Sequence, residues 1–590
     1  MTLNLPAPAV LAAIAAAAAA AAASLCAYFE AGAGTAVFLA CFALFAAAAS
    51  LRTVRRERVV FGLLALLFSD MRVLGRSYDQ LDSYGLIFKN AGAFCRAAVA
   101  FVSLFFAAFS FCLLLCRLLH AAAAGMPKEK EGPRAERRLF LFCALAVFAG
   151  SLPYLALYAP GLNIADTRDQ ILQFFGHPSY IGDGSLLTDH HPVLTTVIYG
   201  LFMRLGLALG SANAGQLLYS LFSLLAVALS TAYLLVTLWR CGLPARAARM
   251  LALFCALWPV TALYAFNMCK DVSAAPCVLL FSALMIRLWH TRGEALDHKP
   301  FVLALFFCAL LLMMLRKSAL YAMLFGALLL IPCLKGRRLR LALAMLGAAV
   351  CFLLYSRLLL PALHIAPGET REALSIPLQQ AARALRDETD IIPEERAALG
   401  RVMNTETAAE AYDPRLADPV KDATNPAPTR QNLSAFFGAW AGIGLRHPSC
   451  YVSAWLNMVY GYFYPSESNT IVCLTLNSPD KGDLTLTQDA SLASCRLALH
   501  NIIYYRLRRI PALGCLFYAD TVTWCFLFLL AVLALRGFFH AAPWGFFLGT
   551  LGICLLSPKS GEIRYLLPVL YALPGMLGAA LLSLQKEGEP

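Results

Sequence analysis

Residues that can perform acid and base chemistry lie close together in one polar stretch of this 590-residue chain. Asp166 and Asp169 belong to the segment GLNIADTRDQ at 161–170, and the pair His190-His191 follows. A carboxylate can accept a proton during a reaction, and histidine can assist acid/base work or bind a metal. Adjacent histidines point in different directions, so one of the two can be structural. The stretch therefore predicts a base with histidine support.

Three short turns between apolar runs carry cations. Their charged residues are Lys270-Asp271, Arg316-Lys317 and Glu562 with Arg564. A cation at the end of a span commonly extends to the membrane interface, and an aspartate often caps a helix. Taken together, cationic turns beside an acidic loop indicate a phosphate or diphosphate site next to a base. This interpretation requires all four segments to lie on one side of a membrane.

The composition indicates that the protein is embedded in a membrane. Hydrophobic residues make up 60% of the chain and charged residues only 14%, with a mean hydropathy of +0.67. A soluble domain with this composition would leave large apolar patches in water. The net charge of +13 lies in short clusters between apolar runs, which is typical of cytoplasmic loops and excludes nucleic-acid binding. The 19 cysteines form no CxxC pair and predict packing residues rather than a zinc site.

Loop charges set the predicted topology, because short cytoplasmic loops are rich in Lys and Arg. The basic clusters expected inside lie at 51–58, 128–138, 240–249, 287–299 and 335–340. An outward segment is then expected at 59–68 and an inward one at 91–119. The apolar stretch 193–206 must stay at the outer surface as an interfacial helix. The acidic loop and the three cationic turns all fall on the outer face.

The predicted fold is an all-α polytopic membrane protein with about 13–14 transmembrane helices and a mixed extracytoplasmic region. The expected parts are N-terminal transmembrane helices at 1–120, a basic cytoplasmic linker at 121–138, a transmembrane core at 139–360 with a first outer loop at 160–213, an extracytoplasmic region at 361–515 and C-terminal transmembrane helices at 516–590.

Eight short motifs follow one another between 153 and 574. They are YAPGLNIAD (158–166), HHPVLTTVIYG (190–200), KD (270–271), LRKSALY (315–321), ALSIPLQQAAR (373–383), DPVK (418–421), GYFYP (461–465) and RYLLP (564–568). Each is common alone, but their order is specific. In that order they resemble the GT-C superfamily of polytopic membrane glycosyltransferases, and most closely a poorly characterised bacterial family within it. The resemblance implies a GT-C-like core.

The resemblance also assigns roles. It implies that Asp166 is the catalytic base, with Asp169 in reserve. The chemistry of histidine adds His191 as a further catalytic candidate. It implies that the donor phosphate is bound by Lys270, Arg316 and Arg564, and the expected supporting residues are His190, Asp271 and Glu562. Many relatives have two adjacent acidic residues in the first loop, whereas Thr167 follows Asp166 here. We therefore expect no cofactor and a mechanism that needs no metal, although a divalent metal stays open.

The implied activity is transfer of a sugar from a polyprenyl-phosphate or diphosphate donor to a cell-envelope glycan, lipid or protein acceptor. The implied location is the bacterial cytoplasmic membrane, with the active face extracytoplasmic. Two alternatives stay open: a transporter or flippase, and a polymerase or ligase of lipid-linked glycans. Transport sites usually lie near mid-membrane, whereas the central parts of these spans are almost free of charge. The lipid bilayer is an expected partner, and nucleic acid is not.

Overall fold

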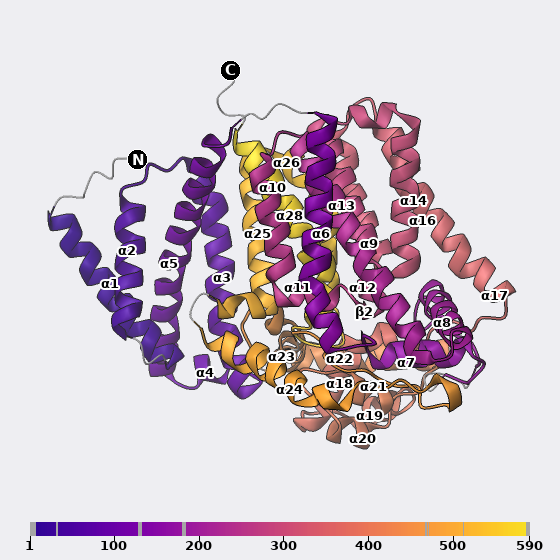
Figure 1. The fold of residues 1–590 in the computed structure, drawn as a ribbon. Coiled ribbons are helices and arrows are strands. Elements are labelled where there is room, and N and C mark those ends of the chain that lie inside the picture. The colour runs from indigo at the N-terminus through magenta and orange to yellow at the C-terminus, as the bar shows by residue number, and fades with distance from the viewer. Residues whose placement is uncertain are drawn as a thin grey trace.

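Long α-helices running side by side make up most of the molecule (Figure 1). The structure is a computed structural model, and it describes residues 8–30, 34–127, 132–179, 185–466, 469, 471–510 and 513–585. Seven of the described helices are long and apolar enough to cross a membrane, and six shorter helices are also apolar. Lipid offers no hydrogen-bond partner to an unpaired backbone group, and a helix suits it because its backbone groups pair within the helix. The chain is thus an α-helical membrane protein.

The N-terminal part is a group of packed helices, namely α1 (Pro8–Phe29), α2 (Gly34–Ala49), α3 (Arg55–Leu81), the short α4 (Gly85–Phe88) and α5 (Ala91–Ala124). The predicted outward segment at 59–68 was too short, because α3 spans 27 residues. Charged residues interrupt its apolar run but find partners. Arg72 forms an ion pair with Asp520 at 2.8 Å, and Arg76 forms one with Glu30 at 3.3 Å. This pairing lets the helix continue past its own charges.

The central part is formed by α6 (Pro133–Leu157), α9 (Ala212–Arg240), α10 (Ala245–Leu257), α11 (Pro259–Tyr264), α12 (Lys270–Ser273), α13 (Ala275–His290), α14 (Lys299–Leu315), α15 (Ala319–Leu330) and α16 (Arg338–Leu354). The chain then continues through a π-helical turn at Tyr355–Leu359 into α17 (Leu360–Ala362). The C-terminal part returns to this group with α25 (Ala519–Leu535), α26 (Phe538–Ala541), α27 (Gly545–Cys554) and α28 (Ile563–Gln585). Helices α9, α13 and α28 pack against one another, and together they bury the main apolar core.

Two further helices, α7 (Ala165–Phe174) and α8 (Val193–Ala208), lie at the lower end of the bundle rather than among its long helices (Figure 1). The short strands β1 (Leu162–Asn163) and β2 (Asn267–Met268) lie at the same end. Helix α8 closely approaches α9, because a Cβ on Gly206 would come within 2.1 Å of the backbone nitrogen of Gly215. The stretch that the sequence predicted as interfacial is this helix.

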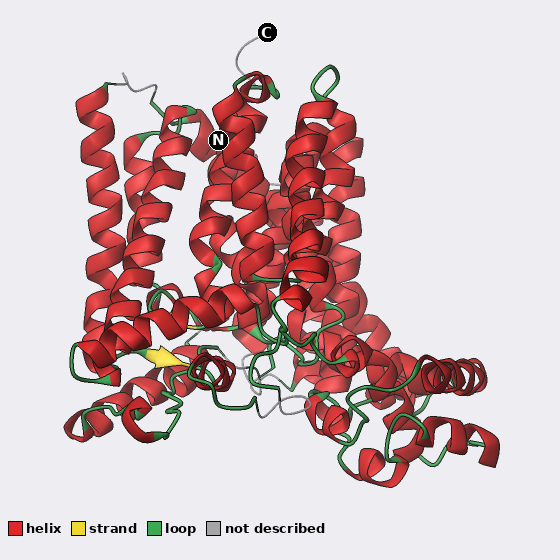
Figure 2. Cartoon of the chain, turned by 90° about the vertical axis from the view of Figure 1, so that its right-hand side faces the viewer, coloured by secondary structure: helices red, strands yellow, loops and turns green. Residues whose placement is uncertain are grey.

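The region at 361–515 forms a layer of short elements below the bundle. Its longer helices are α18 (Ser375–Arg386), α19 (Pro393–Gly400), α20 (Thr405–Glu410), α21 (Asp418–Asp422), α22 (Arg430–Arg446), α23 (Pro448–Val459) and α24 (Ala493–Asn501), joined by 3-10 or π turns at Thr370–Leu374, Tyr460–Tyr462, Gly482–Leu484, Ala490–Leu492 and Ile502–Arg509. The expected mixed composition is not seen, because β pairing among the described residues here is limited to isolated bridges. Figure 2 shows these short helices and loops gathered beneath the long ones.

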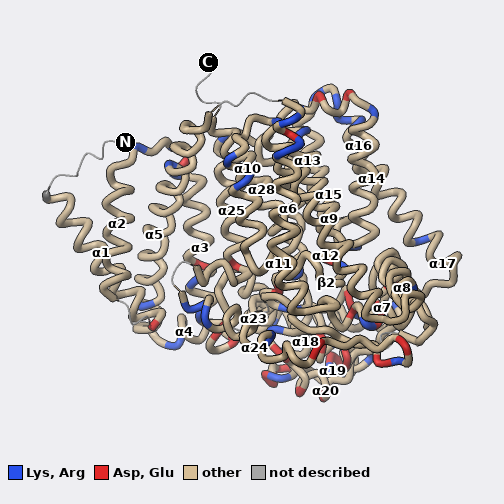
Figure 3. Tube along the Cα trace, in the orientation of Figure 1, with Lys and Arg blue, Asp and Glu red and all other residues tan. Residues whose placement is uncertain are grey.

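Acidic residues are distributed unevenly between the two ends of the bundle. Figure 3 shows mainly Lys and Arg at the upper ends of the long helices, whereas most Asp and Glu lie at the lower end together with further Lys and Arg. The upper basic loops are tied to the helices by ion pairs such as Arg240 with Glu136 at 2.6 Å and Arg337 with Asp297 at 2.7 Å. Residues 128–131 of one predicted basic cluster lie outside the described residues. The basic ends correspond to the predicted cytoplasmic side, which makes the lower end the predicted outer face.

Candidate functional site

Two loops that lie far apart in the sequence are joined in register at the lower end of the bundle. Strand β1 pairs in parallel with β2, with Leu162 opposite Asn267 and Asn163 opposite Met268. The hydroxyl of Thr167 donates to the carbonyl oxygen of Met268. This pairing places the first turn of α7 directly beside the start of α12. Asp166 and Lys270 are therefore brought together by backbone hydrogen bonds as well as by their charges.

Asp166 is the centre of the resulting cluster. Its Oδ2 accepts from Lys270 Nζ at 3.1 Å and from Arg564 Nη1 at 3.3 Å. Lys270 Nζ also lies 3.1 Å from His191 Nδ1. One carboxylate oxygen of α7 is thus shared by cations from α12 and from the start of α28. The other oxygen, Oδ1, makes no hydrogen bond with any described residue.

A second carboxylate, Asp271, shares Arg564 with Asp166 and also pairs with Arg316. Asp271 Oδ1 lies 3.3 Å from Arg316 Nη1, and its Oδ2 lies 3.7 Å from Arg564 Nε. Arg316 also donates to the carbonyl oxygen of Tyr565 at 2.9 Å. The side chains of Arg316 and Asp271 are only 9% and 3% exposed. Arg316 is thus committed to Asp271 and the backbone, and it positions Arg564 through their shared partner.

The cluster as a whole has unbalanced charge. Lys270, Arg316 and Arg564 supply three cations, whereas Asp166 and Asp271 supply two anions, so the group carries one net positive charge. The side chains of Asp166, Lys270 and Arg564 are 25%, 23% and 18% exposed. A ligand can therefore reach them without unfolding the protein. Arginine and lysine in this arrangement favour a phosphate.

Neighbouring charges keep Asp166 ionised. Burial would raise the pKa of this carboxyl, but the positive charges of Lys270 and Arg564 outweigh it and hold the pKa well below its usual value. A carboxylate in this state is a weak base. It becomes a better one only if its cations are drawn elsewhere.

The two histidines of the loop are neutral. Burial and the charge of Lys270 hold the pKa of His191 well below its usual value, and burial lowers the pKa of His190 to about 4. A lysine ammonium has only donors, so Nδ1 of His191 must accept from Lys270 and Nε2 must carry the hydrogen. Nε2 is buried and has no hydrogen-bond partner among the described residues. His191 therefore holds Lys270 through Nδ1 and is not positioned as a base for Asp166.

The lowered pKa of His190 predicts a pH-dependent stability. The folded value is about 4 and the unfolded value is 6.5, so the unfolded chain binds more protons between them. The stability that neutral His190 provides is complete above about pH 6.5 and is lost as the pH falls towards 4. Unfolding of His190→Gln should therefore depend less on pH in this window, as thermal melts at a series of pH values would show. A slope equal to that of wild type would contradict this prediction.

Two of the predicted site residues face elsewhere. Asp169 is fully buried, and its Oδ2 accepts from Gln173 at 2.6 Å and from Ser179 at 2.9 Å. Glu562 is buried and forms an ion pair with Lys559 at 2.6 Å. The ring of His190 lies 4.5 Å from that of His191 in an edge-to-face arrangement. The structure thus assembles Asp166, His191, Lys270, Asp271, Arg316 and Arg564, and leaves Asp169 and Glu562 outside.

Sequence reasoning missed the residues that align the loops. Asn163 accepts from the backbone of Asn477 through its side-chain oxygen and donates to the carbonyl oxygen of Asn477. Its location beside the acidic segment was the only available signal. Lys317, seen in the sequence only as part of a cationic turn, contacts Asp189 Oδ2 at 3.3 Å and donates to the Asp189 carbonyl oxygen. The two contacts of Lys317 with Asp189 fix the loop that carries the histidines.

The sequence motifs in the layer of short helices at 361–515 make contacts that hold this layer together. In α18 the side chain of Gln379 donates to the carbonyl oxygens of Asp413 and Leu416, and the apolar residues of α18 pack in the core of this layer. Lys421 forms ion pairs at 2.7 Å with both Glu372 and Asp418. These contacts support the shape of the layer below the cluster.

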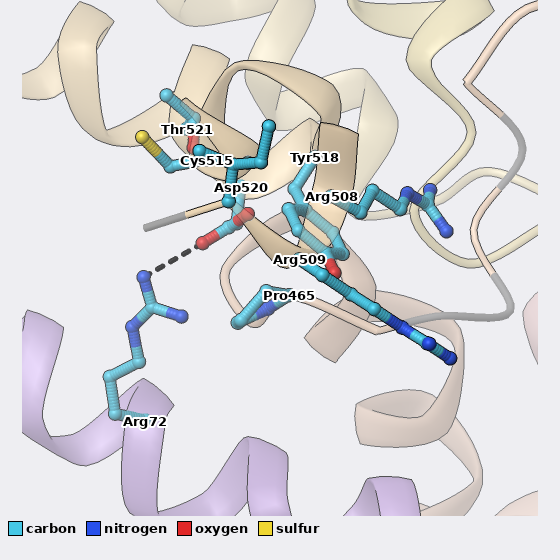
Figure 4. Close-up of a pocket in the computed structure, with 10 residues that line it drawn as sticks. Arg72, Pro465, Arg508, Arg509, Cys515, Tyr518, Asp520 and Thr521 are labelled. Atoms are coloured by element: carbon cyan, nitrogen blue, oxygen red, sulfur yellow. Dashed lines mark hydrogen bonds and ion pairs between the residues drawn. The ribbon is translucent and has the colours of Figure 1, made fainter. Parts of the chain in front are cut away.

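A polar cavity of about 230 Å³ lies apart from this cluster, where α3 meets the segment before α25 (Figure 4). Its charged lining includes Arg72, paired with Asp520, and Arg508. Arg508 is held by hydrogen bonds to the carbonyl oxygens of Asn469 and Phe517. No carboxylate in this cavity is shared by several cations, so we place the candidate site at Asp166. The described residues contain no group of three or more His, Cys, Asp or Glu side chains suited to a metal ion.

Comparison with known proteins gives one match. Residues 180–588 match a family of unknown function, DUF6020. No curated protein and no solved structure matches the chain. The matched part begins after Asp166 and includes His191, Lys270, Arg316 and Arg564. It covers well over half of the chain, and the protein therefore belongs to the DUF6020 family.

Proposed function

We propose that the protein is a membrane glycosyltransferase that moves a sugar from a polyprenyl-phosphate or polyprenyl-diphosphate donor to a cell-envelope acceptor. The observation that supports this most is the shared oxygen of Asp166, because it puts a carboxylate and two accessible cations in one place. The order of the GT-C-like motifs supports it independently. On this proposal the helical bundle is a GT-C-like core with about 13–14 spans, and α8 lies at the membrane interface.

The reaction follows from the positions of these groups. An acceptor hydroxyl or amine attacks the anomeric carbon of the donor, and its proton passes to Asp166 Oδ1. The bond between the anomeric carbon and the phosphate oxygen breaks, and that oxygen leaves with the electron pair. Lys270 and Arg564 stabilise the charge that develops there, an effect worth about 3–4 kcal/mol for a single well-placed donor. Arg316 and Asp271 keep Arg564 in place.

The location of the site suits a lipid-linked donor. The cluster lies where long apolar helices meet the layer of short polar ones, so a phosphate can bind there while its lipid tail stays in the bilayer. The chemistry proposed needs no nucleotide, and each group that it uses is supplied by the chain.

Transfer by the purified protein tests this proposal. The protein is reconstituted in vesicles with a panel of radiolabelled polyprenyl-phosphate sugars and extracted envelope acceptors, and the product is scored by chromatography. Radiolabel on an acceptor other than the lipid carrier supports the proposed glycosyltransferase. Growth of a glycan chain on the lipid carrier would instead support the polymerase alternative. Movement of an intact donor across the vesicle membrane without any product would favour a flippase.

The proposed active face makes a separate prediction. Asp483 and Arg338 are exposed at opposite ends of the bundle, and the charge pattern puts only Asp483 outside the cell. In a background without native cysteines, Asp483→Cys should react with a membrane-impermeant maleimide in intact cells. Arg338→Cys should react only after the membrane is permeabilised. The reverse pattern of labelling would move the site to the cytoplasmic face and contradict an extracytoplasmic reaction.

A further inference from the structure

Asp166 holds its two cations through a single oxygen. Lys270 and Arg564 both donate to Oδ2, and Oδ1 makes no hydrogen bond with a described residue. Oδ1 is therefore available to an acceptor proton, while Oδ2 is occupied by the groups that suit a phosphate.

Both cations can leave Asp166 without losing their positions. Arg564 keeps Asp271 as a second partner through Nε, 3.7 Å away, so its outer nitrogens can turn to another ligand. Lys270 keeps His191 Nδ1 at 3.1 Å. Asp271 itself is held by buried Arg316 and cannot follow. The cluster therefore has a fixed inner layer and an outer carboxylate whose partners can be exchanged.

From this arrangement we infer that the donor phosphate takes Lys270 and Arg564 away from Asp166 and so converts an ion-paired carboxylate into the catalytic base. The inference rests on the proposed function. Arginine and lysine bind phosphate oxygens at least as well as a carboxylate, and the net positive charge of the cluster favours the exchange. The bound phosphate also places a negative charge near Asp166. Both changes make the carboxylate a stronger proton acceptor.

The same exchange resets the site after the reaction. The acceptor O–H proton moves to Asp166 Oδ1 as the new glycosidic bond forms, and the donor bond breaks with its electrons on the leaving phosphate. When the lipid phosphate departs, Lys270 and Arg564 return to Oδ2. Their charges then expel the proton from Asp166 to water. Without a donor the base stays blocked, which protects the site from idle proton transfer.

Competition between Asp166 and phosphate gives a sharp test. The probe is an unreactive polyprenyl methyl phosphodiester, whose single charge does not titrate near neutral pH. If Asp166 competes for the cations, Asp166→Asn should bind this probe about tenfold to a hundredfold more tightly than wild type, as expected when one opposing charge is removed at close range. Asp483→Asn removes the same charge from an exposed place on the same face and should leave the affinity unchanged.

The outcomes separate the inference from the proposed function. Equal or weaker binding by Asp166→Asn, with measurable binding by wild type, overturns the exchange but keeps the phosphate site. No binding by any variant overturns both. Proton uptake provides a second readout. At pH 5, calorimetry in two buffers should show that wild type takes up more protons on binding the probe than Asp166→Asn does, because His190 and His191 are present in both proteins, and equal uptake would overturn the exchange.

Discussion

Asp166→Asn should reduce sugar transfer by a factor of about a thousand or more, the upper part of the range for loss of a general base. Asparagine keeps the size of the side chain and can still contact Lys270 and Arg564, but it cannot accept the acceptor proton. Donor binding should persist. The measurement is the initial rate of transfer by equal amounts of reconstituted protein, with Asp483→Asn as the matched control.

Retained activity would assign the base elsewhere. Asp169 is buried against Gln173 and Ser179, so full activity of Asp166→Asn would require a rearrangement of that pocket. His191 is neutral but accepts from Lys270, and it would need a different partner to act as a base. A normal rate for Asp166→Asn would therefore contradict the reaction scheme proposed for this site.

Asp271→Ala should lower the free energy of unfolding by about 3–5 kcal/mol, the usual result of removing one partner from a buried ion pair. Arg316 would be left charged and buried, with the Tyr565 carbonyl oxygen and the Ser318 hydroxyl as its remaining partners. The measurement is denaturant unfolding of the purified protein in detergent. A control is Asp297→Ala, which removes an exposed partner of Arg337 and should change stability little.

A small effect of Asp271→Ala would show that Arg316 does not depend on this partner. The double change Asp271→Asn with Arg316→Gln separates charge from packing. It removes both charges and keeps two polar side chains of similar size, so it should be less destabilising than Asp271→Ala alone. If the double variant is the less stable of the two, the ion pair is not the source of the loss.

The grouping of the site could be predicted from loop charges alone. Each basic cluster fixes one loop inside, so the segments with Asp166, Lys270, Arg316 and Arg564 must all lie at the opposite end. Four segments confined to one end of a compact bundle have few places to go. In the structure these four residues lie together at one end of the bundle.

Partners within that group could not be predicted. Arg316 and Arg564 look alike in the sequence, yet only Arg564 reaches Asp166, because Asp271 and the Tyr565 carbonyl hold Arg316 in the buried layer. Asp169 is one helical turn from Asp166 and points to a different pocket. Which side of a helix faces the cluster depends on long-range contacts such as the pairing of β1 with β2.

Charged residues also explain why the segment predicted at 59–68 in the N-terminal part was too short. The apolar stretch in α3 ends before Arg72, and the predicted segment ended with it. In the structure Arg72 forms an ion pair with Asp520 of α25. Arg76 forms an ion pair with Glu30, which follows α1. Such partners lie hundreds of residues away or beyond another helix, and local hydropathy contains no signal for them. The number of spans stays a prediction for the same reason.

The position of a bound donor phosphate tests the central claim most directly. A structure of the protein determined by electron cryo-microscopy with a polyprenyl phosphate bound should show the phosphorus atom beside Lys270 and Arg564, with Asp166 Oδ1 facing the space where an acceptor would enter. Density for the phosphate in the cavity lined by Arg72 and Arg508, or at neither place, would contradict the assignment of Asp166 and its cations as the site.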